Sequence, residues 1–194
     1  MQVISDLISN TDISLLRLIH EHRIKAFDQV LYYISYLTSY ISTGLILTVL
    51  IISLKKKSKL LRTVFYKMLA VLIVAATISF TLKNLIIRER PFVTYPDIEK
   101  LSQAGSSSFP SGHTIEAFAI AVAFSIAFPR LKFIIPLFIW ASIVAYSRMA
   151  LGVHYPSDVI AGMIIGGLIG WIVPALMRRG SSEAVIAKFH RKSR

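Results

Sequence analysis

Five long apolar stretches, separated by short polar segments, dominate this chain. They cover residues 31–54, 68–87, 114–128, 133–147 and 159–177, and the charged residues inside them are Lys83 and Glu116. A helix crosses a bilayer with about 20 mostly apolar residues, and about 17 is the lower bound. The first, second and fifth stretches reach that length, whereas the third and fourth reach it only if their polar ends stand in the interface.

This continuous apolarity argues against a soluble protein. Of the 194 residues 55% are hydrophobic, and the mean hydropathy is +0.64. A soluble protein of this size would have to make nearly every helix apolar on all sides. We therefore predict an all-α integral membrane bundle of about five transmembrane helices, forming one domain over residues 1–194, with a transmembrane core at 29–178 and a basic tail at 179–194.

Residues 1–28 form a mixed and charged N-terminal segment. It lacks the basic start and apolar core of a cleavable signal peptide, so none is expected. Asp12 is predicted to cap a short helix over residues 13–22, in which Ile13, Leu16 and either Ile19 or His20 share one face. This amphipathic pattern favours an interfacial helix lying on the membrane, with a disordered leader as the alternative.

The distribution of charge predicts the orientation of the bundle. The chain has 22 Lys and Arg against 10 Asp and Glu, and no cysteine, which excludes disulfides and thiolate metal sites. Segments 55–67, 128–132 and 178–194 hold 14 of the basic residues and one acidic residue, so the rest of the chain has a formal charge of −1. The positive-inside rule places these segments in the cytoplasm and the N-terminus outside. Topology and anionic lipids account for the excess charge of +12, and no nucleic-acid partner is expected.

Three polar clusters fall on the opposite, outer face. The first is Lys83, Arg88, Glu89 and Arg90, followed by Pro91. Lys83 and Arg90 are seven residues apart, so they share one face if the helix continues to Pro91, and Arg88 is predicted to pair with Glu89. Taken alone, these residues are equally typical of cations that snorkel at a membrane edge.

The second cluster is the sequence FPSGHT, residues 109–114. Pro110 and Ser111 favour a helix start, and Gly112 permits close backbone approach. Free N–H groups and the positive end of the helix dipole make such a start an anion site. His113 stands at this helix start, although a single histidine there is more often an ordinary interfacial residue.

The third cluster is SRMALGVHYPSD, residues 147–158. Arg148 ends the fourth apolar stretch, and Pro156 begins the helix of the fifth, with His154 just before it. Asp158 lies in the first turn of that helix, where it either caps the helix or holds an imidazole N–H of His154, leaving the other ring nitrogen free as a nucleophile.

Together the clusters supply three cations, two histidines, one carboxylate and two helix starts on one face. That set suits phosphoryl transfer, in which cations and N–H donors hold phosphate oxygens, one histidine attacks and the other protonates the leaving oxygen. A metal is not expected, because the cations would repel it and the sequence has no HxxxH or HExxH spacing. No cofactor is expected either.

The three clusters resemble the signature motifs of the type 2 phosphatidic acid phosphatase superfamily. They are Lys-x6-Arg-Pro from Lys83, Pro-Ser-Gly-His from Pro110, and Ser-Arg-x5-His-x3-Asp from Ser147. The resemblance implies a metal-independent phosphatase with a phosphohistidine intermediate. It implies a nucleophile at His154, its orienting partner at Asp158 and a general acid at His113. The phosphate ligands implied are Lys83, Arg90, Ser111, Gly112 and Arg148. Members usually have six spans, and here the N-terminal segment takes the place of the first.

Two features lie outside these motifs. Gly162, Gly166 and Gly170 repeat every four residues, which predicts close helix contact within the monomer rather than a dimer face. Glu116 lies one turn beyond His113, and a carboxylate inside a membrane span is a functional candidate. It is expected either to tune His113 or to pair with a nearby cation.

We therefore expect a lipid phosphatase acting at the outer face of the membrane, with undecaprenyl diphosphate or phosphatidylglycerophosphate as the favoured substrates and lipid A as the alternative. The small size favours a bacterial inner-membrane protein, with the site on the periplasmic or extracellular side. A vanadate-dependent haloperoxidase shares the motifs but is a soluble class. A lipid-binding or transport protein on the same scaffold is the alternative from a different class.

Overall fold

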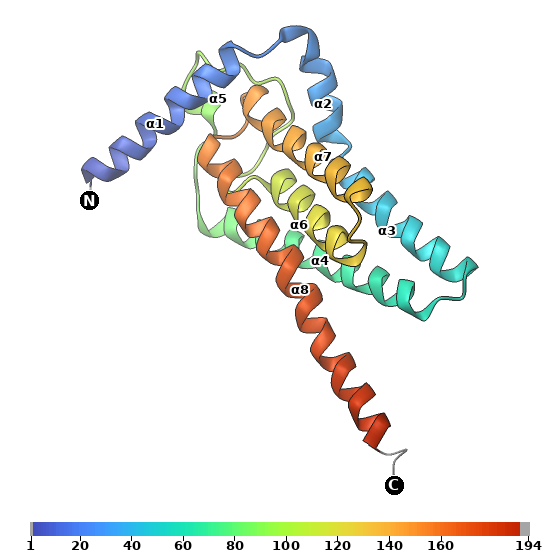
Figure 1. Cartoon of the computed structure of the whole chain (residues 1–194). Helices are drawn as coiled ribbons and strands as arrows, with labels where there is room; N and C mark the ends of the chain where they lie inside the picture. The colour runs from blue at the N-terminus through green and yellow to red at the C-terminus, as the bar shows by residue number, and fades with distance from the viewer. Residues whose placement is uncertain (1, 191–194) are drawn as a thin grey trace.

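The computed structural model describes the backbone of residues 2–190 and the side chains of residues 9–177. Over this part the chain is helical without a strand, and α1 crosses one end of an elongated bundle (Figure 1). The elements are α1 (Gln2–Glu21), the 3-10 turn η1 (Lys25–Phe27), α2 (Asp28–Tyr36), α3 (Thr38–Lys55), α4 (Lys59–Leu85), α5 (Pro91–Thr94), α6 (Gly112–Ala127), α7 (Leu131–Ala150) and α8 (Pro156–His190). The side chains of the predicted tail at 179–194 lie outside the described residues.

Among the described helices, four are long and apolar enough to cross a membrane. They are α3, α4, α7 and residues 156–177 of α8, whereas α6 is shorter at 16 residues. α7 extends beyond the fourth apolar stretch and has 20 residues. The protein is therefore an all-α integral membrane bundle, as the hydropathy pattern predicts, and α6 is the helix whose apolar length falls short.

The first apolar stretch was predicted as one helix, and this is wrong. α2 and α3 divide it at Leu37, whose φ and ψ are −80° and 0°. The Thr38 hydroxyl donates to the Ile34 carbonyl at 3.3 Å, a side-chain contact that bends helices. Main-chain hydrogen bonds still cross the junction, from the Leu37 N–H to Tyr33 and from the Ile41 N–H to Leu37. The stretch is thus two helices joined by a bend.

α6 lies at the centre of the bundle and packs against α3, α4, α7 and α8. A Cβ added at Gly166 would lie 2.4 Å from the Ile115 carbonyl oxygen, and one at Gly170 would lie 2.5 Å from that of Ala119. The glycine repeat therefore lets α8 touch the backbone of α6. The prediction that these glycines serve packing within the monomer is confirmed.

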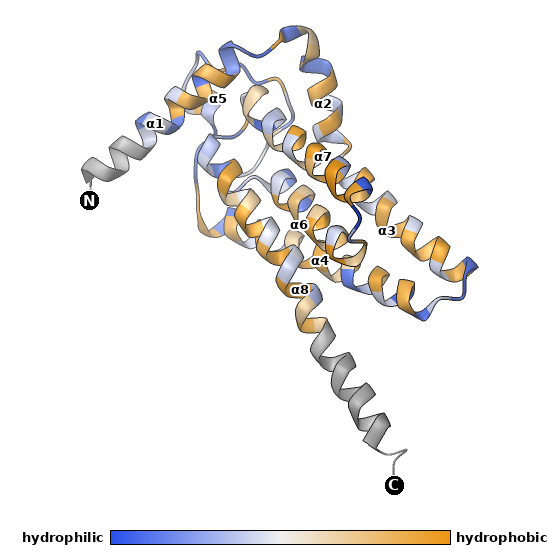
Figure 2. Cartoon of the chain, viewed as in Figure 1, coloured by the Kyte–Doolittle hydropathy of each residue, from blue (hydrophilic) through white to orange (hydrophobic). Residues whose placement is uncertain are grey.

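Large apolar side chains cover the outside of the bundle rather than only its core. Leu47 and Ile51 on α3, Phe80 on α4, Ile139 on α7 and Ile164 on α8 are all exposed. Figure 2 shows hydrophobic residues along the outer sides of these helices. Apolar surface this extensive marks an interaction site, and around a ring of spanning helices it fits contact with lipid tails.

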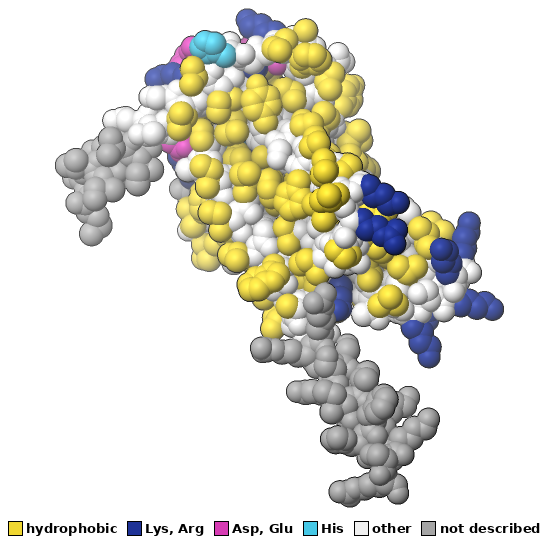
Figure 3. All heavy atoms as spheres, in the orientation of Figure 1, with side chains coloured by type: hydrophobic (Ala, Val, Ile, Leu, Met, Phe, Trp, Pro, Cys, Tyr) yellow, Lys and Arg dark blue, Asp and Glu magenta, His cyan; other side chains and the backbone are white. Residues whose placement is uncertain are grey.

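The two ends of the bundle differ in charge. The turns from α3 to α4 and from α6 to α7 carry basic residues at one end: Lys55, Lys56, Lys57, Lys59, Arg130 and Lys132. Among the coloured side chains, the charged ones that Figure 3 shows at that end are Lys and Arg, whereas basic, acidic and histidine side chains mix at the end crossed by α1. The polar clusters of the sequence all lie at this mixed end.

α1 packs outside the spanning bundle, against the ends of α7 and α8. Its buried residues Ile13 and Leu16 contact Ile98 and Tyr155, which matches the predicted apolar face. Asp12, however, does not cap the helix, because α1 begins at Gln2 and Asp12 lies in its middle. The Asp12 carboxylate is buried and binds residues near the start of α8, as described below.

Candidate active site

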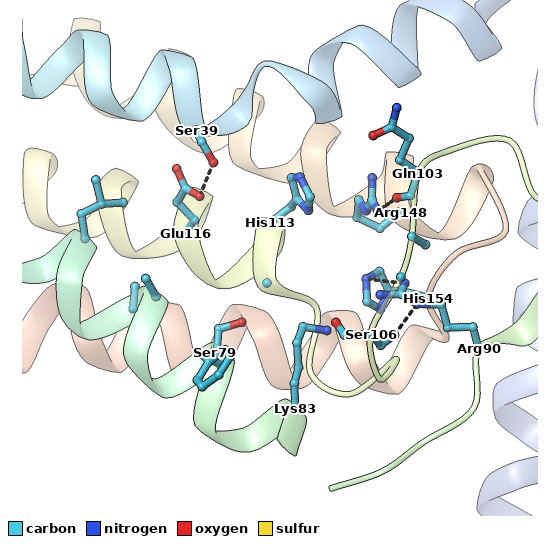
Figure 4. A pocket seen from close by; sticks show the side chains of 17 residues that line it. Ser39, Ser79, Lys83, Arg90, Gln103, Ser106, His113, Glu116, Arg148 and His154 are labelled. Carbon is cyan, nitrogen blue, oxygen red and sulfur yellow. Dashed lines mark hydrogen bonds between the residues drawn. The ribbon is translucent and has the colours of Figure 1, made fainter. Parts of the chain in front are cut away.

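A cavity of about 540 Å³ opens where the three polar clusters meet. Seven residues singled out in the sequence line it: Lys83, Arg90, Gly112, His113, Glu116, Arg148 and His154. Figure 4 shows the side chains converging from α4, α6, α7 and the loops that precede α5 and α8. Asp158 and Ser111 are fully buried and lie behind the wall of the cavity.

His154 lies in the short loop between α7 and α8, with 2% of its surface exposed. Arg90 Nη1 lies 3.3 Å from His154 Nε2. Because a guanidinium only donates, Nε2 accepts, so the ring proton is on Nδ1. Burial, together with the cations of Arg148 and Arg90, lowers the pKa of His154 to about 3 against the opposing effect of Asp158. The imidazole is therefore neutral near pH 7, and its Nε2 lone pair points at the Arg90 guanidinium, which lines the same cavity.

Asp158 stands behind this imidazole, in the first turn of α8. Its Oδ2 lies 3.5 Å from His154 Nδ1, longer than a formed hydrogen bond. The same oxygen accepts from the Ser108 hydroxyl at 2.5 Å and from the Tyr155 N–H at 3.0 Å. The carboxylate thus reaches back into the loop, so the capping and orienting roles that the sequence left open are compatible.

α6 begins at Gly112 with Ser111 as its N-cap, as the sequence predicts, and His113 follows in its first turn. A Cβ at Gly112 would lie 2.9 Å from the Ser79 hydroxyl, so α4 approaches this helix start closely. The Ser111 hydroxyl pairs with that of Thr114 at 2.8 Å rather than facing the cavity. Ser111 and Gly112 as phosphate ligands therefore remain predictions, and the backbone at Gly112 is the part that reaches the cavity.

The three predicted phosphate-binding cations all donate to oxygen atoms of the protein itself. Lys83 Nζ donates to Ser107 O at 2.7 Å, and Arg90 Nε donates to Ser106 O at 2.8 Å. Arg148 donates to the hydroxyls of Ser35 and Ser102. Each cation is thus supplied with oxygen acceptors around the cavity.

The route that brings Lys83 and Arg90 together differs from the prediction. α4 ends at Leu85, so the two residues do not share a face of one continuous helix. Arg90 instead lies in extended backbone before α5, and it reaches the site by hydrogen bonds to Val153 O and Ser106 O. The chain leaves the helix because Ile86 adopts an extended conformation.

The predicted pairing of Arg88 with Glu89 is also wrong. Arg88 Nη1 donates to Asp158 Oδ1 and its Nη2 donates to Asp12 Oδ2, each at 2.6 Å. Glu89 instead accepts from the Thr94 hydroxyl at 3.2 Å. The motifs did not indicate the hydrogen bonds that Arg88 and Ser108 make to Asp158, or the bond from Arg88 to Asp12. The spacing of these residues along the chain gives no sign of them.

Among the described residues, Glu116 forms no hydrogen bond or ion pair with His113 or with a cation, so the expected pairing with a cation is wrong. Its Oε2 accepts from the Ser39 hydroxyl of α3 at 2.8 Å, and its Oε1 is buried without a hydrogen-bond partner. The carboxylate lines the inner part of the cavity, beside apolar residues of α4 that include Leu72, Ala75 and Ala76. The cavity therefore has a cationic part and a second part in which apolar side chains of α4 lie beside Glu116.

Residues 63–181 match the PAP2 superfamily, and this range covers more than half of the chain. The chain belongs to the PAP2 superfamily. An undecaprenyl-diphosphatase from Bacillus subtilis is 32% identical to it over 100 residues, which are 52% of this chain and 51% of that protein. A lipid A 4'-phosphatase from Bacteroides thetaiotaomicron is 36% identical over 84 residues, which are 43% of this chain and 37% of that protein.

The PAP2 fold is also shared with solved structures. A transmembrane PAP2-type phosphatidylglycerolphosphate phosphatase from Bacillus subtilis matches with a TM-score of 0.73 and 25% identity, over 89% of this chain and 87% of that one. The chain spans about half of the length of one curated relative and about a third of the other. The activities of these relatives are therefore not assigned to this chain. This member of the PAP2 superfamily thus groups with membrane lipid phosphatases.

Proposed function

We propose that the protein is a metal-independent phosphatase that removes the terminal phosphate from a membrane lipid. The observation that carries this proposal is the convergence of two histidines and three cations in one cavity that is also lined by apolar side chains of α4. His154 Nε2 is a neutral, cavity-facing nucleophile, and Lys83, Arg90 and Arg148 provide the positive charge that a phosphate needs.

In the first step His154 Nε2 attacks phosphorus, and the bond from phosphorus to the lipid oxygen breaks. His113 gives its proton to that oxygen, so the lipid leaves as a neutral hydroxyl or as a monophosphate. In the second step water attacks the phosphohistidine, the N–P bond breaks, and His113 takes a proton from the water. Inorganic phosphate leaves, and both histidines return to their starting states.

The phosphate oxygens take over donors that now bind the protein itself. The ammonium of Lys83 and the guanidinium of Arg90 donate to loop carbonyls, and Arg148 donates to two serine hydroxyls and a carbonyl. The first backbone N–H groups of α6 add donors at the positive end of its dipole. These groups surround the point at which negative charge increases during attack.

The apolar wall of the cavity supports a lipid as the substrate. Leu72, Ala75, Ala76 and Phe80 line the cavity on the α4 side, and Phe80 is exposed at the surface of the bundle. A lipid chain can follow this wall from the bilayer while its head group reaches the cations. Undecaprenyl diphosphate and phosphatidylglycerophosphate are the substrates we favour, and lipid A is the alternative because a lipid A phosphatase is among the relatives.

The charge pattern supports a site on the non-cytoplasmic face. The basic turns lie at the end of the bundle opposite to the cavity, and the positive-inside rule assigns that end to the cytoplasm. In a bacterium this orientation would place the reaction at the periplasmic or extracellular face of the inner membrane. Labelling of single cysteines in the cysteine-free chain, one at Lys57 and one at Asp97, tests the orientation in intact cells.

Phosphate release by the purified protein tests the function. The substrates are polyprenyl diphosphate, phosphatidylglycerophosphate, phosphatidic acid and lipid A in mixed micelles, each with and without EDTA. We expect release that EDTA does not reduce, that His154→Ala abolishes and that the exposed-site control His22→Ala leaves intact. Binding of these lipids without any release would instead identify a non-catalytic lipid-binding protein.

A further inference from the structure

A half-buried guanidinium lies between two buried carboxylates behind the nucleophile. Arg88 donates to Asp158 on one side and to Asp12 of α1 on the other, each at 2.6 Å. The Asp158 side chain is 0% exposed and that of Asp12 is 5% exposed. Burial alone would lower the pKa of Arg88, but Asp158 and Asp12 together raise it above its ordinary value, so the guanidinium stays charged.

Asp12 also holds the first turn of α8, which carries Asp158. Its Oδ1 accepts from the Ser157 N–H at 2.8 Å, and its Oδ2 accepts from the Ser157 hydroxyl at 2.5 Å. The Ser157 N–H is one of the free donors at the start of α8, so a carboxylate from a different helix serves as its cap. Arg88 lies over the Tyr155 ring at 3.9 Å, which fixes the guanidinium against the same loop.

We propose that Asp12 is a positioning and charge-balancing residue of the active site, acting through Arg88 on the pair formed by Asp158 and His154. The inference rests on the proposed function, because phosphate release is its readout. It makes α1 a part of the catalytic unit rather than only a helix that covers one end of the bundle.

The charge argument follows from the contacts. Arg88 paired with Asp158 alone would be neutral, and Asp158 would then offer little net negative charge to His154. Asp12 adds a second carboxylate, so the group of three carries a net charge of −1, and both of its carboxylates are buried. When phosphorus bonds to Nε2, the imidazole becomes cationic, and that charge is stabilised by the net negative group behind it.

Asp12→Asn is the sharpest change, because the amide keeps one oxygen that can accept from the Ser157 N–H, whereas the charge and the second acceptor, which binds Arg88, are lost. We expect kcat to fall by about 10- to 100-fold, the usual loss when a group that orients a catalytic side chain is removed. KM should stay within about twofold, because Asp12 does not line the cavity that takes the lipid phosphate. Asp12→Glu, which restores the charge, should recover part of the lost kcat.

Asp97→Asn is the matched control. Asp97 also holds α1, through an ion pair with Arg17 at 2.7 Å, but both side chains are exposed and neither touches the site. It should leave kcat unchanged. An equal loss in Asp97→Asn would mean that docking of α1, and not the Asp12 charge, sets the rate, and the proposal would be wrong.

Asp12 and Arg88 should also act as a unit in a double-mutant cycle. Arg88→Gln combined with Asp12→Asn again leaves a net charge of −1, so the combined loss in kcat should be smaller than the product of the two single losses. Independent, multiplying effects would contradict the proposal, as would a wild-type kcat in a folded Asp12→Asn protein. If the wild-type protein released no phosphate from any lipid, the proposed function itself would fail.

Discussion

Gly166→Ala tests whether contact between the α6 and α8 backbones sets the geometry of the site. The new Cβ would lie 2.4 Å from the Ile115 carbonyl oxygen, whereas ordinary contact begins at 3.4 Å, so the two helices must separate by about 1 Å. A carbonyl on a central helix cannot turn aside as a flexible side chain can. Overpacking of this kind costs about 1–3 kcal/mol.

Gly167→Ala is the internal standard, because a Cβ at Gly167 would have nothing within 4 Å. Both changes gain about 1 kcal/mol of helix propensity, so the difference between the two variants isolates the steric cost of about 1–3 kcal/mol. At about 2–4 °C per kcal/mol, Gly166→Ala should unfold at least about 2 °C below Gly167→Ala in detergent, followed by circular dichroism.

The same separation should be visible in the reaction. α6 carries His113 and α8 carries Asp158, and misplacement of catalytic groups by about 1 Å can cost about 100-fold in rate. We expect phosphate release to fall by up to that factor in Gly166→Ala and to stay at the wild-type rate in Gly167→Ala. Equal unfolding temperatures and equal rates in the two variants would refute the reasoning.

Three further predictions concern the site. His154→Asn should lower kcat by about 10⁴-fold or more while the protein still folds, as measured by phosphate release and circular dichroism, and a rate near the wild type would exclude this residue as the nucleophile. Glu116→Gln replaces a carboxylate that lines the cavity with a neutral amide. If the leaving group of the proposed reaction lies beside it, kcat/KM for polyprenyl diphosphate should rise about two- to fivefold relative to phosphatidylglycerophosphate, and no change would mean that the carboxylate does not sense the leaving group. Burial lowers the pKa of His154 to about 3, so between about pH 6.5 and pH 3 the imidazole binds a proton in the unfolded chain but not in the folded protein. The unfolding temperature should therefore fall from pH 7 to pH 5, and it should fall less in His154→Asn. A drop of equal size in the two proteins would exclude His154 as its source.

Local patterns predicted much of this structure. Spanning helices and helix starts are determined by residues that are close together in the sequence, so a local pattern can indicate them. The structure confirms the helix starts at Gly112 and Pro156. The three motifs also indicated groups that meet in the cavity. Within each motif the residues are only a few positions apart, so they lie in the same short loop or helix start. The glycine repeat on α8 likewise indicated its close partner within the monomer.

Contacts between distant segments could not be predicted in this way. Arg88 and Asp12 are 76 residues apart, and Ser39 and Glu116 are 77 apart, so no spacing signals either pair. The prediction for Lys83 and Arg90 failed because it assumed a regular helix up to Pro91, whereas α4 ends at Leu85. Helical periodicity predicts the direction of a side chain only within the helix. In the loop that follows, side-chain directions depend on the conformation of the loop.

The loop carbonyls bound by Lys83 and Arg90 have a consequence for how product leaves. Each contact that phosphate makes with these cations replaces a hydrogen bond that the chain makes to itself, at 2.7 Å and 2.8 Å. The net gain on binding is therefore only the difference between the contact to phosphate and the contact to a carbonyl that it replaces. Free phosphate competes for Lys83 and Arg90 with loop carbonyls that belong to the same chain and are always present. This competition favours the release of phosphate and keeps the site available for the next lipid.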